Sequence, residues 1–284
     1  MSKKLDTQAI GLDAGLKLMQ WLTGAENLHY GLWTGLEPNA GNLGAAQAAY
    51  TDKLLKLVPS HPCRILDIGG GAGETAKKLI ALGHTVEIVV PSKLLAERCR
   101  ANAPDAHVHE MPFEDFGGEG AFDVCLFSES YQYIPLEVGL TKCLAMLADD
   151  GVIIVSDCFR PEGFKVDKSR PKVGGGHRLP KFRALLETLP VEVTFEEDIT
   201  AAVAPSVDIE QALFNVVGYA VTRIDEELSA KRPTQRAVLR RLWRLVVKDR
   251  SRKRLNQRLN ERTRTSEAFE THNRYLMMTL KHRS

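Results

Sequence analysis

The sequence predicts an α/β fold: a doubly wound, mainly parallel sheet, with a helical arm before it and a helical lid insertion before its last strand. Two observations lead to this prediction. A short apolar run at residues 64–68 enters a glycine-rich loop, which opens a helix over residues 74–82. Further strand-like runs then alternate with helical segments, at residues 85–90, 107–111, 121–127 and 152–157. Alternation of this kind is typical of a parallel sheet.

Apolar periodicity predicts the elements around these strands. Before the sheet, residues 5–22 and 42–58 place apolar side chains at helical spacing. Ser92 suits the N-cap of a helix over residues 92–102. The pattern continues with two helices and a sixth strand, at residues 136–147, 179–189 and 191–199. Residues 162–180 are rich in Gly, Pro and Lys, and we expect a long loop there.

The glycine loop after the first strand leaves room for a ligand. Its glycines are Gly69, Gly70, Gly71 and Gly73. They permit backbone conformations and close approaches that any side chain would block. Backbone N–H groups at the start of the following helix face a ligand in sites of this kind. A tight strand-to-helix turn without a ligand is the alternative.

The spacing of the loop separates two kinds of nucleotide site. The dinucleotide fingerprint requires GxGxxG, whereas residues 67–73 read DxGxGxG. This pattern resembles motif I of the class I S-adenosylmethionine (SAM) methyltransferases. The resemblance implies a Rossmann-like domain with seven strands over about residues 26–280. It also implies SAM as the cofactor and S-adenosyl-L-homocysteine as its product.

Other segments resemble the same family, in the same order. Residues 128–135, SESYQYIP, resemble motif IV after the fourth strand. Residues 148–151, ADDG, are similar to the turn before the fifth strand, and residues 275–281 resemble the antiparallel seventh strand. Residues 26–33, ENLHYGLW, resemble an arm found in the small-molecule branch, which includes tocopherol, sarcosine and cyclopropane-synthase-like enzymes.

The arm has two interpretations. The resemblance implies that His29, Tyr30 and Trp33 line the methionine end of the cofactor and the substrate cavity. Alternatively, Tyr30 and Trp33 are core aromatics that anchor an N-terminal extension.

The end of the second strand departs from the family. An Asp or Glu usually stands there to accept hydrogen bonds from the ribose hydroxyls, but this chain has Val90 and Pro91. Glu87 comes too early in the strand, and Ser92 is uncharged. Loss of a charge-assisted hydrogen bond costs about 1.5–3 kcal/mol. Weak SAM binding, or a different ligand, therefore stays open.

The resemblance, together with the polar residues expected after the strand ends and in the glycine-rich loop, gives two sets of candidate site residues. The cofactor-binding candidates are Tyr30, Trp33, Asp67, Gly69, Gly70, Gly71, Gly73, Val90, Pro91, Phe113, Glu114, Ser128 and Glu129. The catalytic candidates on the acceptor side are Tyr30, Tyr131, Tyr133 and His177. An acid after Phe113 suits the adenine amino group, which only donates, although a solvated acidic turn is the alternative. His177 follows three glycines and could act as a general base, or it is simply exposed.

Composition limits the class of protein. The chain has 284 residues, 44% of them hydrophobic, and a net charge of +2. No apolar run approaches the roughly 20 residues of a membrane span, and the N-terminus lacks an apolar stretch, so we expect a cytoplasmic enzyme. Five cysteines form no CxxC pair, and His107 and His109 lack an evident third ligand. No metal site is predicted.

The predicted organisation has four parts. They are a helical arm at residues 1–60, a SAM-binding core at 61–203, a basic helical lid insertion at 204–271 and a final core strand at 272–284. Within the insertion, residues 231–264 carry fourteen Lys and Arg against Asp249 and Glu261. This segment is a solvated lid, a surface for an acidic protein such as an acyl carrier protein, or a surface for an anionic membrane or nucleic acid. Nucleic acid is least favoured because no aromatic stacking platform accompanies the charge.

These expectations define a function. We expect a SAM-dependent methyltransferase of biosynthesis, which transfers the methyl group in line to a small or carrier-bound organic molecule. One alternative is an interaction protein on the same fold with weakened or lost catalysis, because Val90 stands where an acid is expected. Another is an RNA or protein methyltransferase that uses the basic segment.

Overall fold

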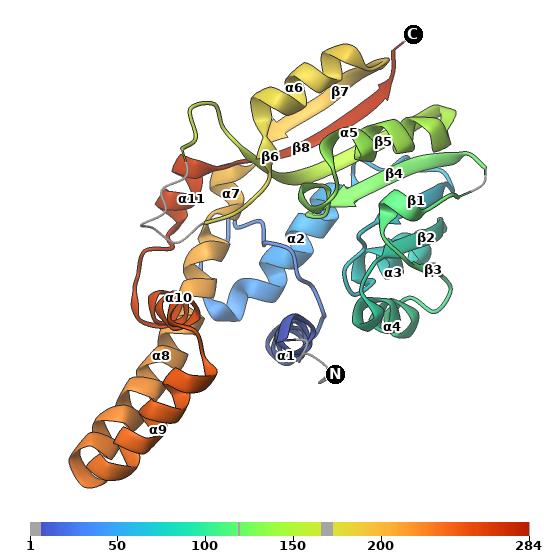
Figure 1. Ribbon diagram of the computed structural model, residues 1–284. Helices are drawn as coiled ribbons and strands as arrows, with labels where there is room; N and C mark the ends of the chain where they lie inside the picture. Colours follow the sequence, from blue (N-terminus) through green and yellow to red (C-terminus); the bar gives the residue numbers. More distant parts are fainter. Residues whose placement is uncertain (1–6, 119, 166–172, 284) are drawn as a thin grey trace. The chain divides into compact units, whose positions relative to one another are not determined.

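The computed structural model describes residues 7–118, 120–165 and 173–283 (Figure 1). The chain divides into two compact units, each described by itself. The first consists of Met1–Phe164, Gly175–Val203 and Asn273–Ser284, and the second of Lys165–Gly174 and Ala204–His272. None of the helices in the described ranges is long and apolar enough to cross a membrane.

The first unit is built on one sheet with the strand order β3-β2-β1-β4-β5-β8-β7 (Figure 1). Its strands are β1 Arg64–Ile68, β2 Thr85–Val90, β3 His107–Glu110, β4 Phe122–Ser128, β5 Leu147–Arg160, β6 His177–Arg178, β7 Val191–Asp198 and β8 Arg274–His282. β8 runs antiparallel to both β5 and β7, and the other pairs are parallel. The predicted doubly wound, mainly parallel sheet is confirmed. Seven strands form the continuous path, and the short β6 adds an eighth beside β5.

Helices connect these strands. They are α1 Thr7–Thr23, α2 Leu43–Leu55, α3 Glu74–Ala81, α4 Lys93–Asn102, α5 Leu136–Met146, α6 Leu179–Thr188 and α7 Thr200–Val203, with 3-10 turns η1 Ala40–Asn42, η2 Phe113–Asp115 and η3 Tyr131–Tyr133. β1 pairs with β2 on one side and with β4 on the other. The chain therefore changes winding direction at β1, and ligands of open α/β sheets bind beyond the strand ends at such a point.

The core explains why the central strands form. Ile65, Leu66 and Ile68 of β1 are fully buried, as are most side chains of β4 and β5. Parallel strands covered on both faces require such continuous apolar runs. β7, in contrast, lies at the sheet edge and is mostly exposed. Both faces of this edge strand are largely exposed, including Val193 and Phe195.

Two segments of the first unit differ in detail from expectation. Residues 148–151, expected as a turn, belong to β5, which begins at Leu147. The pairing of β4 with β5 shifts register between Phe122 and Val124, and this irregularity accommodates the polar residues within the strand. The expected long loop contains β6, which pairs with the end of β5. Residues 166–172 of that loop lie outside the described part of the chain.

The second unit is helical. It contains α8 Pro205–Lys231, α9 Pro233–Val246, α10 Asp249–Asn260 and α11 Ser266–His272. The basic segment is divided into two helices, α9 and α10, because Val247 between them has extended backbone angles.

α8 packs closely on α10. A Cβ atom on Gly218 would lie 2.1 Å from the carbonyl oxygen of Leu259, so only glycine permits this approach. Nearby, the Asn215 side chain donates to the Leu259 carbonyl at 3.0 Å, and the Gln211 side chain donates to the Arg258 carbonyl at 2.9 Å. Polar side chains of α8 thus hold α10 in place.

Candidate functional site

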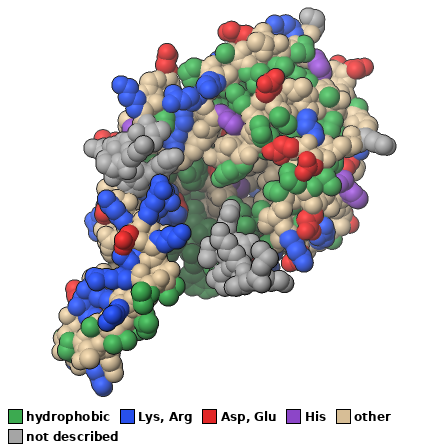
Figure 2. Space-filling view, viewed as in Figure 1, with side chains coloured by type: hydrophobic (Ala, Val, Ile, Leu, Met, Phe, Trp, Pro, Cys, Tyr) green, Lys and Arg blue, Asp and Glu red, His purple; other side chains and the backbone are tan. Residues whose placement is uncertain are grey.

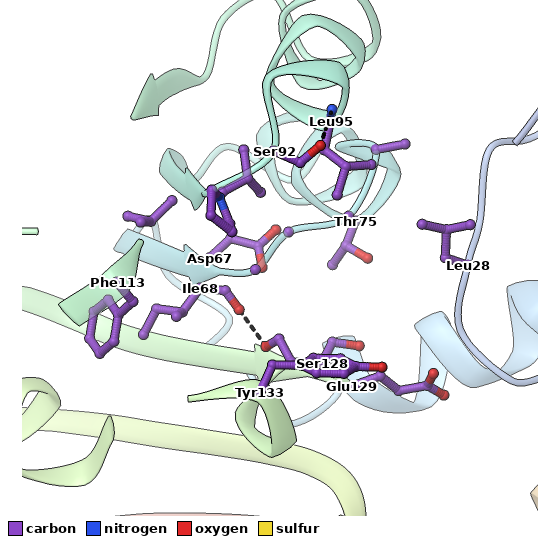
Figure 3. A pocket seen from close by; sticks show the side chains of 18 of the residues that line it. Leu28, Asp67, Ile68, Thr75, Ser92, Leu95, Phe113, Ser128, Glu129 and Tyr133 are labelled. Atoms are coloured by element: carbon purple, nitrogen blue, oxygen red, sulfur yellow. Dashed lines mark hydrogen bonds between the residues drawn. The ribbon is translucent and has the colours of Figure 1, made fainter. Parts of the chain in front are cut away.

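A cavity of about 830 Å³ opens beyond the ends of β1, β2 and β4 (Figure 3). Figure 3 shows Asp67 at the end of β1, Ser92 before α4 and Glu129 after β4 around this cavity. Its position is the point at which the sheet changes winding direction. The volume is in the range of small-molecule and cofactor sites.

The glycine loop forms the floor of the cavity. Gly69 has φ +76°, and a Cβ atom there would lie 2.4 Å from the Ser130 Cβ atom. Gly73 has φ +88°, and its added Cβ would lie 2.9 Å from the Cys99 Cα atom. A side chain is excluded at both positions by conformation and by space. Gly70 and Gly71 line the cavity between them.

Asp67 faces the cavity with an unsatisfied oxygen. The residue is only 1% exposed, and its Oδ2 atom has no hydrogen-bond partner among the described residues. Burial raises the pKa of this carboxyl from 3.8 to about 7. Buried carboxylate oxygens are normally hydrogen-bonded. A ligand that brings a donor to the cavity therefore fits here.

Glu129 is held in an unusual conformation at the end of β4. Its φ of +56° is rare for a residue with a side chain. The Tyr30 backbone N–H donates to Glu129 Oε1 at 2.8 Å, and the Tyr275 hydroxyl donates to the same atom at 2.9 Å. Burial raises the pKa of Glu129 to about 7. Strained, desolvated carboxyls at strand ends are common in functional sites.

A buried polar network supports Glu129. The Tyr275 hydroxyl lies 2.8 Å from the Tyr50 hydroxyl, which lies 2.7 Å from Ser156 Oγ and 3.2 Å from Ser128 Oγ. Sequence reasoning missed Tyr50, Tyr275 and Ser156. A polar serine inside the apolar run VIIVS was the one available signal for this network.

Glu26 also lines the cavity and was missed. It lies in the arm before α2, is 2% exposed, and accepts a hydrogen bond from Asn102 through Oε2 at 2.9 Å. Its Oε1 atom has no hydrogen-bond partner, although an Arg98 guanidinium nitrogen lies 3.6 Å away. Asp67 and Glu26, which both line the cavity, therefore each carry a buried carboxylate oxygen without a hydrogen-bond partner among the described residues.

The β2 side of the cavity is different. Val90, Pro91, Ser92 and Lys93 line it. The Ser92 hydroxyl accepts a hydrogen bond from the Leu95 N–H at 3.4 Å and caps α4. Glu87, further back in the strand, accepts from the Arg64 guanidinium at 2.7 Å and lies 2.8 Å from a ring nitrogen of His109.

The structure brings many of the predicted residues together. Those that line the cavity are Asp67, Gly69, Gly70, Gly71, Val90, Pro91, Phe113, Glu114, Ser128, Glu129 and Tyr133. Phe113 is buried and Glu114 exposed, so an apolar face and an acid lie side by side. Tyr133 is 80% exposed.

Other candidates lie outside the described cavity lining. They are Tyr30, Trp33, Gly73, Tyr131 and His177. Tyr131 is fully buried, and its hydroxyl donates to the Leu136 carbonyl. A ring nitrogen of His177 lies 2.9 Å from the Ile134 carbonyl oxygen, which ties β6 to the η3 turn. The Trp33 backbone N–H donates to the Ala202 carbonyl, and its side chain is buried.

His29 of the arm does line the cavity. Burial lowers the pKa of its imidazole to about 4, so the ring is neutral at physiological pH. The ring stacks on Tyr50 with centroids 4.5 Å apart, and Nε2 lies 3.2 Å from the Thr51 hydroxyl. Within the described ranges, no group of three His, Cys, Asp or Glu is placed to hold a metal ion.

Comparisons with known proteins agree with this geometry. Residues 66–155 match the family model described as a methyltransferase domain. A ubiquinone biosynthesis O-methyltransferase of Bradyrhizobium diazoefficiens is 31% identical over 128 residues, which are 42% of this chain and 50% of that protein. The chain therefore matches only half the length of this curated relative.

Solved structures share the fold at low sequence identity. The cyclopropane synthase MmaA2 from Mycobacterium tuberculosis aligns with a TM-score of 0.70 and 14% identity, covering 99% of both chains. A geranyl diphosphate C-methyltransferase from Streptomyces coelicolor, in complex with S-adenosyl-L-homocysteine, aligns with a TM-score of 0.63 and 12% identity, covering 95% of this chain and 97% of that one. Residues 66–155 thus match a methyltransferase domain, and the solved structures show that the predicted Rossmann-like methyltransferase fold is correct.

Proposed function

We propose that this protein transfers the methyl group of SAM to a small organic molecule, free or bound to a carrier. The observation that supports this most strongly is the Asp67 carboxyl, whose oxygen lacks a partner beside a side-chain-free glycine loop. Both features suit a ligand with a cationic or hydrogen-bond-donating group close to the backbone. A cytoplasmic location and a role in biosynthesis belong to the same proposal.

The cavity residues fit the cofactor. Gly69, Gly70 and Gly71 leave space along the floor, and Asp67 offers an acceptor there. Phe113 and Glu114 offer an apolar ring face and an acceptor for an adenine amino group. Each of these residues was predicted as a cofactor contact from the sequence.

Glu26 is our candidate to replace the acid missing at the end of β2. Val90 and Pro91 have no polar side chains, and the Ser92 hydroxyl already caps α4. Glu26 lines the same cavity, and its buried Oε1 atom has no hydrogen-bond partner among the described residues, with an Arg98 guanidinium nitrogen 3.6 Å away. We therefore assign it to accept a hydrogen bond from the cofactor, a role that the second strand fills in related enzymes.

The reaction needs a proton acceptor for a hydroxyl or amine substrate. When bound, SAM supplies the electrophilic methyl group. Glu129 is the residue placed to accept the proton, because it lines the cavity and its pKa is about 7, close to the value that suits a general base at neutral pH. The Tyr275 hydroxyl and the Tyr30 N–H hold Oε1, which fixes the orientation of this carboxyl.

An oxygen acceptor is our first choice. The curated relative is named as an O-methyltransferase. A hydroxyl needs a general base to become a good nucleophile, whereas a neutral amine is already nucleophilic, so a carboxylate base suits an oxygen acceptor better. Leu12, Leu28 and Ile134 add apolar surface to the cavity lining, which suits a substrate with an aromatic or aliphatic body. Tyr133 stands among them as a candidate contact for that body.

Methyl transfer is tested with methyl-labelled SAM and a panel of small hydroxylated aromatic and aliphatic acceptors. We expect labelled product, and S-adenosyl-L-homocysteine formed in equal amount, with at least one acceptor of this class. Label transferred only to RNA or protein would contradict the proposal. SAM binding without transfer to any acceptor would favour the second candidate, an interaction protein on this fold, which the absence of an acid at Val90 motivates.

A further inference from the structure

The helical second unit exposes an unusually apolar surface. On α9, the exposed apolar side chains are Val238, Leu239, Leu242, Trp243, Leu245 and Val246. On α8 they are Val216, Val217, Tyr219, Val221 and Ile224. Figure 2 shows hydrophobic side chains beside basic ones over the α9 end of this unit. Several of these residues are more than half exposed, and Val246 is 80% exposed. Soluble proteins rarely leave a large contiguous apolar patch uncovered, and the six α9 residues share one helical face.

The α9 apolar face, defined by the six α9 residues above, is one side of a strongly two-sided helix. Leu239, Leu242 and Val246 recur at the spacing of one helical face. Four arginines occupy the other side and surround one shallow cavity, namely Arg236, Arg240, Arg241 and Arg244. Arg236 and Arg240 pair with Asp225 of α8 at 2.6 and 3.1 Å. These ion pairs attach the basic side of α9 to α8, and the apolar face is left exposed.

The exposed faces are not used by the unit's own packing. α10 lies against the side of α8 that carries Gln211, Asn215 and Gly218. That side differs from the one that carries Val217, Val221 and Ile224, which follow i, i+4, i+7 spacing. The packing within this unit therefore leaves these apolar side chains uncovered.

Charge selects among the possible partners. Residues 231–264 carry fourteen Lys and Arg against two acidic residues. A second copy of the chain would place two such segments against each other, and their repulsion opposes association. A nucleic acid would match the charge but would leave the apolar faces uncovered. An anionic bilayer offers negative headgroups above an apolar interior, so it matches both features.

We infer that the α8–α9 hairpin docks on the surface of an anionic phospholipid bilayer. The α9 apolar face enters the headgroup and acyl boundary, and Trp243 lies at the depth that indole rings prefer. Arginines beside that face extend their side chains to lipid phosphates. The helices lie on the bilayer, since none of the described helices can span it. This inference stands independently of the proposed methyl transfer.

The test is co-sedimentation of the full-length protein with vesicles. One set contains phosphatidylcholine alone, and the other contains phosphatidylcholine with one third phosphatidylglycerol. We expect binding to the anionic vesicles, weak binding to the neutral ones, and release as salt rises, because screening removes the electrostatic part. The double variant Leu242→Glu/Trp243→Glu should lower vesicle affinity by at least about tenfold. The double variant Arg241→Gln/Arg244→Gln should lower it by about twenty-five-fold, at roughly fivefold for each arginine.

A matched control separates docking from general surface hydrophobicity. Trp21 of α1 is 81% exposed and lies in the first unit, so Trp21→Glu should leave vesicle binding unchanged. Circular dichroism and SAM affinity should be unchanged in all three variants, which confirms that they fold. The inference is overturned if the wild-type protein stays in the supernatant with anionic vesicles. It is also overturned if the wild-type protein is a stable dimer that the double variant Leu242→Glu/Trp243→Glu dissociates. A third contrary result is that the arginine variant binds nucleic acid more weakly but binds vesicles as the wild type does.

Discussion

Two sides of the cavity handle charge in opposite ways. At the ends of β1 and β4, Asp67 and Glu129 are buried carboxyls with pKa values raised to about 7. At the end of β2, Val90 and Pro91 are followed by Ser92, whose hydroxyl caps α4. Desolvation of a charged group costs free energy unless a partner compensates it. The buried carboxyls of the first side therefore lower the stability of the ligand-free protein. On the second side the strand supplies no acid, and Glu26 of the arm is our proposed replacement.

Glu129→Gln should have the largest effect. Glutamine keeps an oxygen that accepts from the Tyr275 hydroxyl and the Tyr30 N–H, but it cannot accept a proton from the substrate. General-base removal typically costs about 10²–10⁴-fold in rate. We expect kcat to fall within that range while SAM affinity stays unchanged, measured by steady-state kinetics and calorimetry. An unchanged kcat would remove Glu129 from the proposed chemistry.

The pH dependence of the free energy of unfolding tests whether burial of the Asp67 carboxyl destabilises the ligand-free protein. Because the folded protein holds the Asp67 proton up to about pH 7 and the unfolded chain only to about pH 4, the folded state binds more protons in this window. Stability of the ligand-free protein should therefore fall as pH rises from 4 to 7, by up to about 1.4 kcal/mol per pH unit for this group.

Asp67→Asn should flatten that dependence, as followed by chemical denaturation at several pH values. The exposed Asp150→Asn is the control and should leave the slope unchanged. An identical slope in wild type and Asp67→Asn would show that Asp67 is ionised in the folded protein without penalty.

Glu26→Gln tests whether the arm supplies the missing acid. A charge-assisted hydrogen bond is worth about 1.5–3 kcal/mol, so SAM affinity should fall at least about tenfold. Asp13→Asn is a matched control, because Asp13 pairs with the same Arg98 at 3.1 Å but does not line the described cavity. Equal losses in both variants would assign the effect to Arg98 instead of to Glu26.

Ser92→Asp should give the smallest change and the opposite sign. Aspartate caps helices as well as serine does, so α4 should keep its first turn. The added carboxylate lines the side of the cavity that lacks one, and SAM affinity should rise severalfold. Calorimetry measures this directly. A loss of affinity would indicate that Ser92 itself contacts the ligand.

Local signals explain how much of this structure the sequence predicts. The run RILDI, the glycines and the strand-like segments at β2 to β5 are each readable within a few residues, and together they predicted the sheet. Asp67 and Glu129 could be placed because strand ends of a parallel sheet meet at one edge. The sequence also predicted that the β2 side of the cavity lacks an acid, since Val90 stands where an acid is expected.

Long-range contacts explain the rest. The Tyr50–Tyr275 hydrogen bond joins residues 225 positions apart, and no local pattern indicates it. Glu26 reaches the cavity only because the arm folds back to α4 and the glycine loop. His177 follows a glycine-rich segment that suggests an open loop, yet its ring contacts two backbone carbonyls beside β6. The basic segment breaks at Val247, where the backbone is extended although the apolar periodicity continues.

Titration of the wild-type protein and Asp67→Asn with SAM, followed by calorimetry, tests the central claim most directly. We predict saturable binding by the wild type with one site per chain and a dissociation constant in the micromolar range. Asp67→Asn should weaken that binding by at least about tenfold, because the cavity loses its buried carboxylate acceptor. No detectable binding by the wild type at millimolar SAM, or equal affinity in both proteins, would contradict the account.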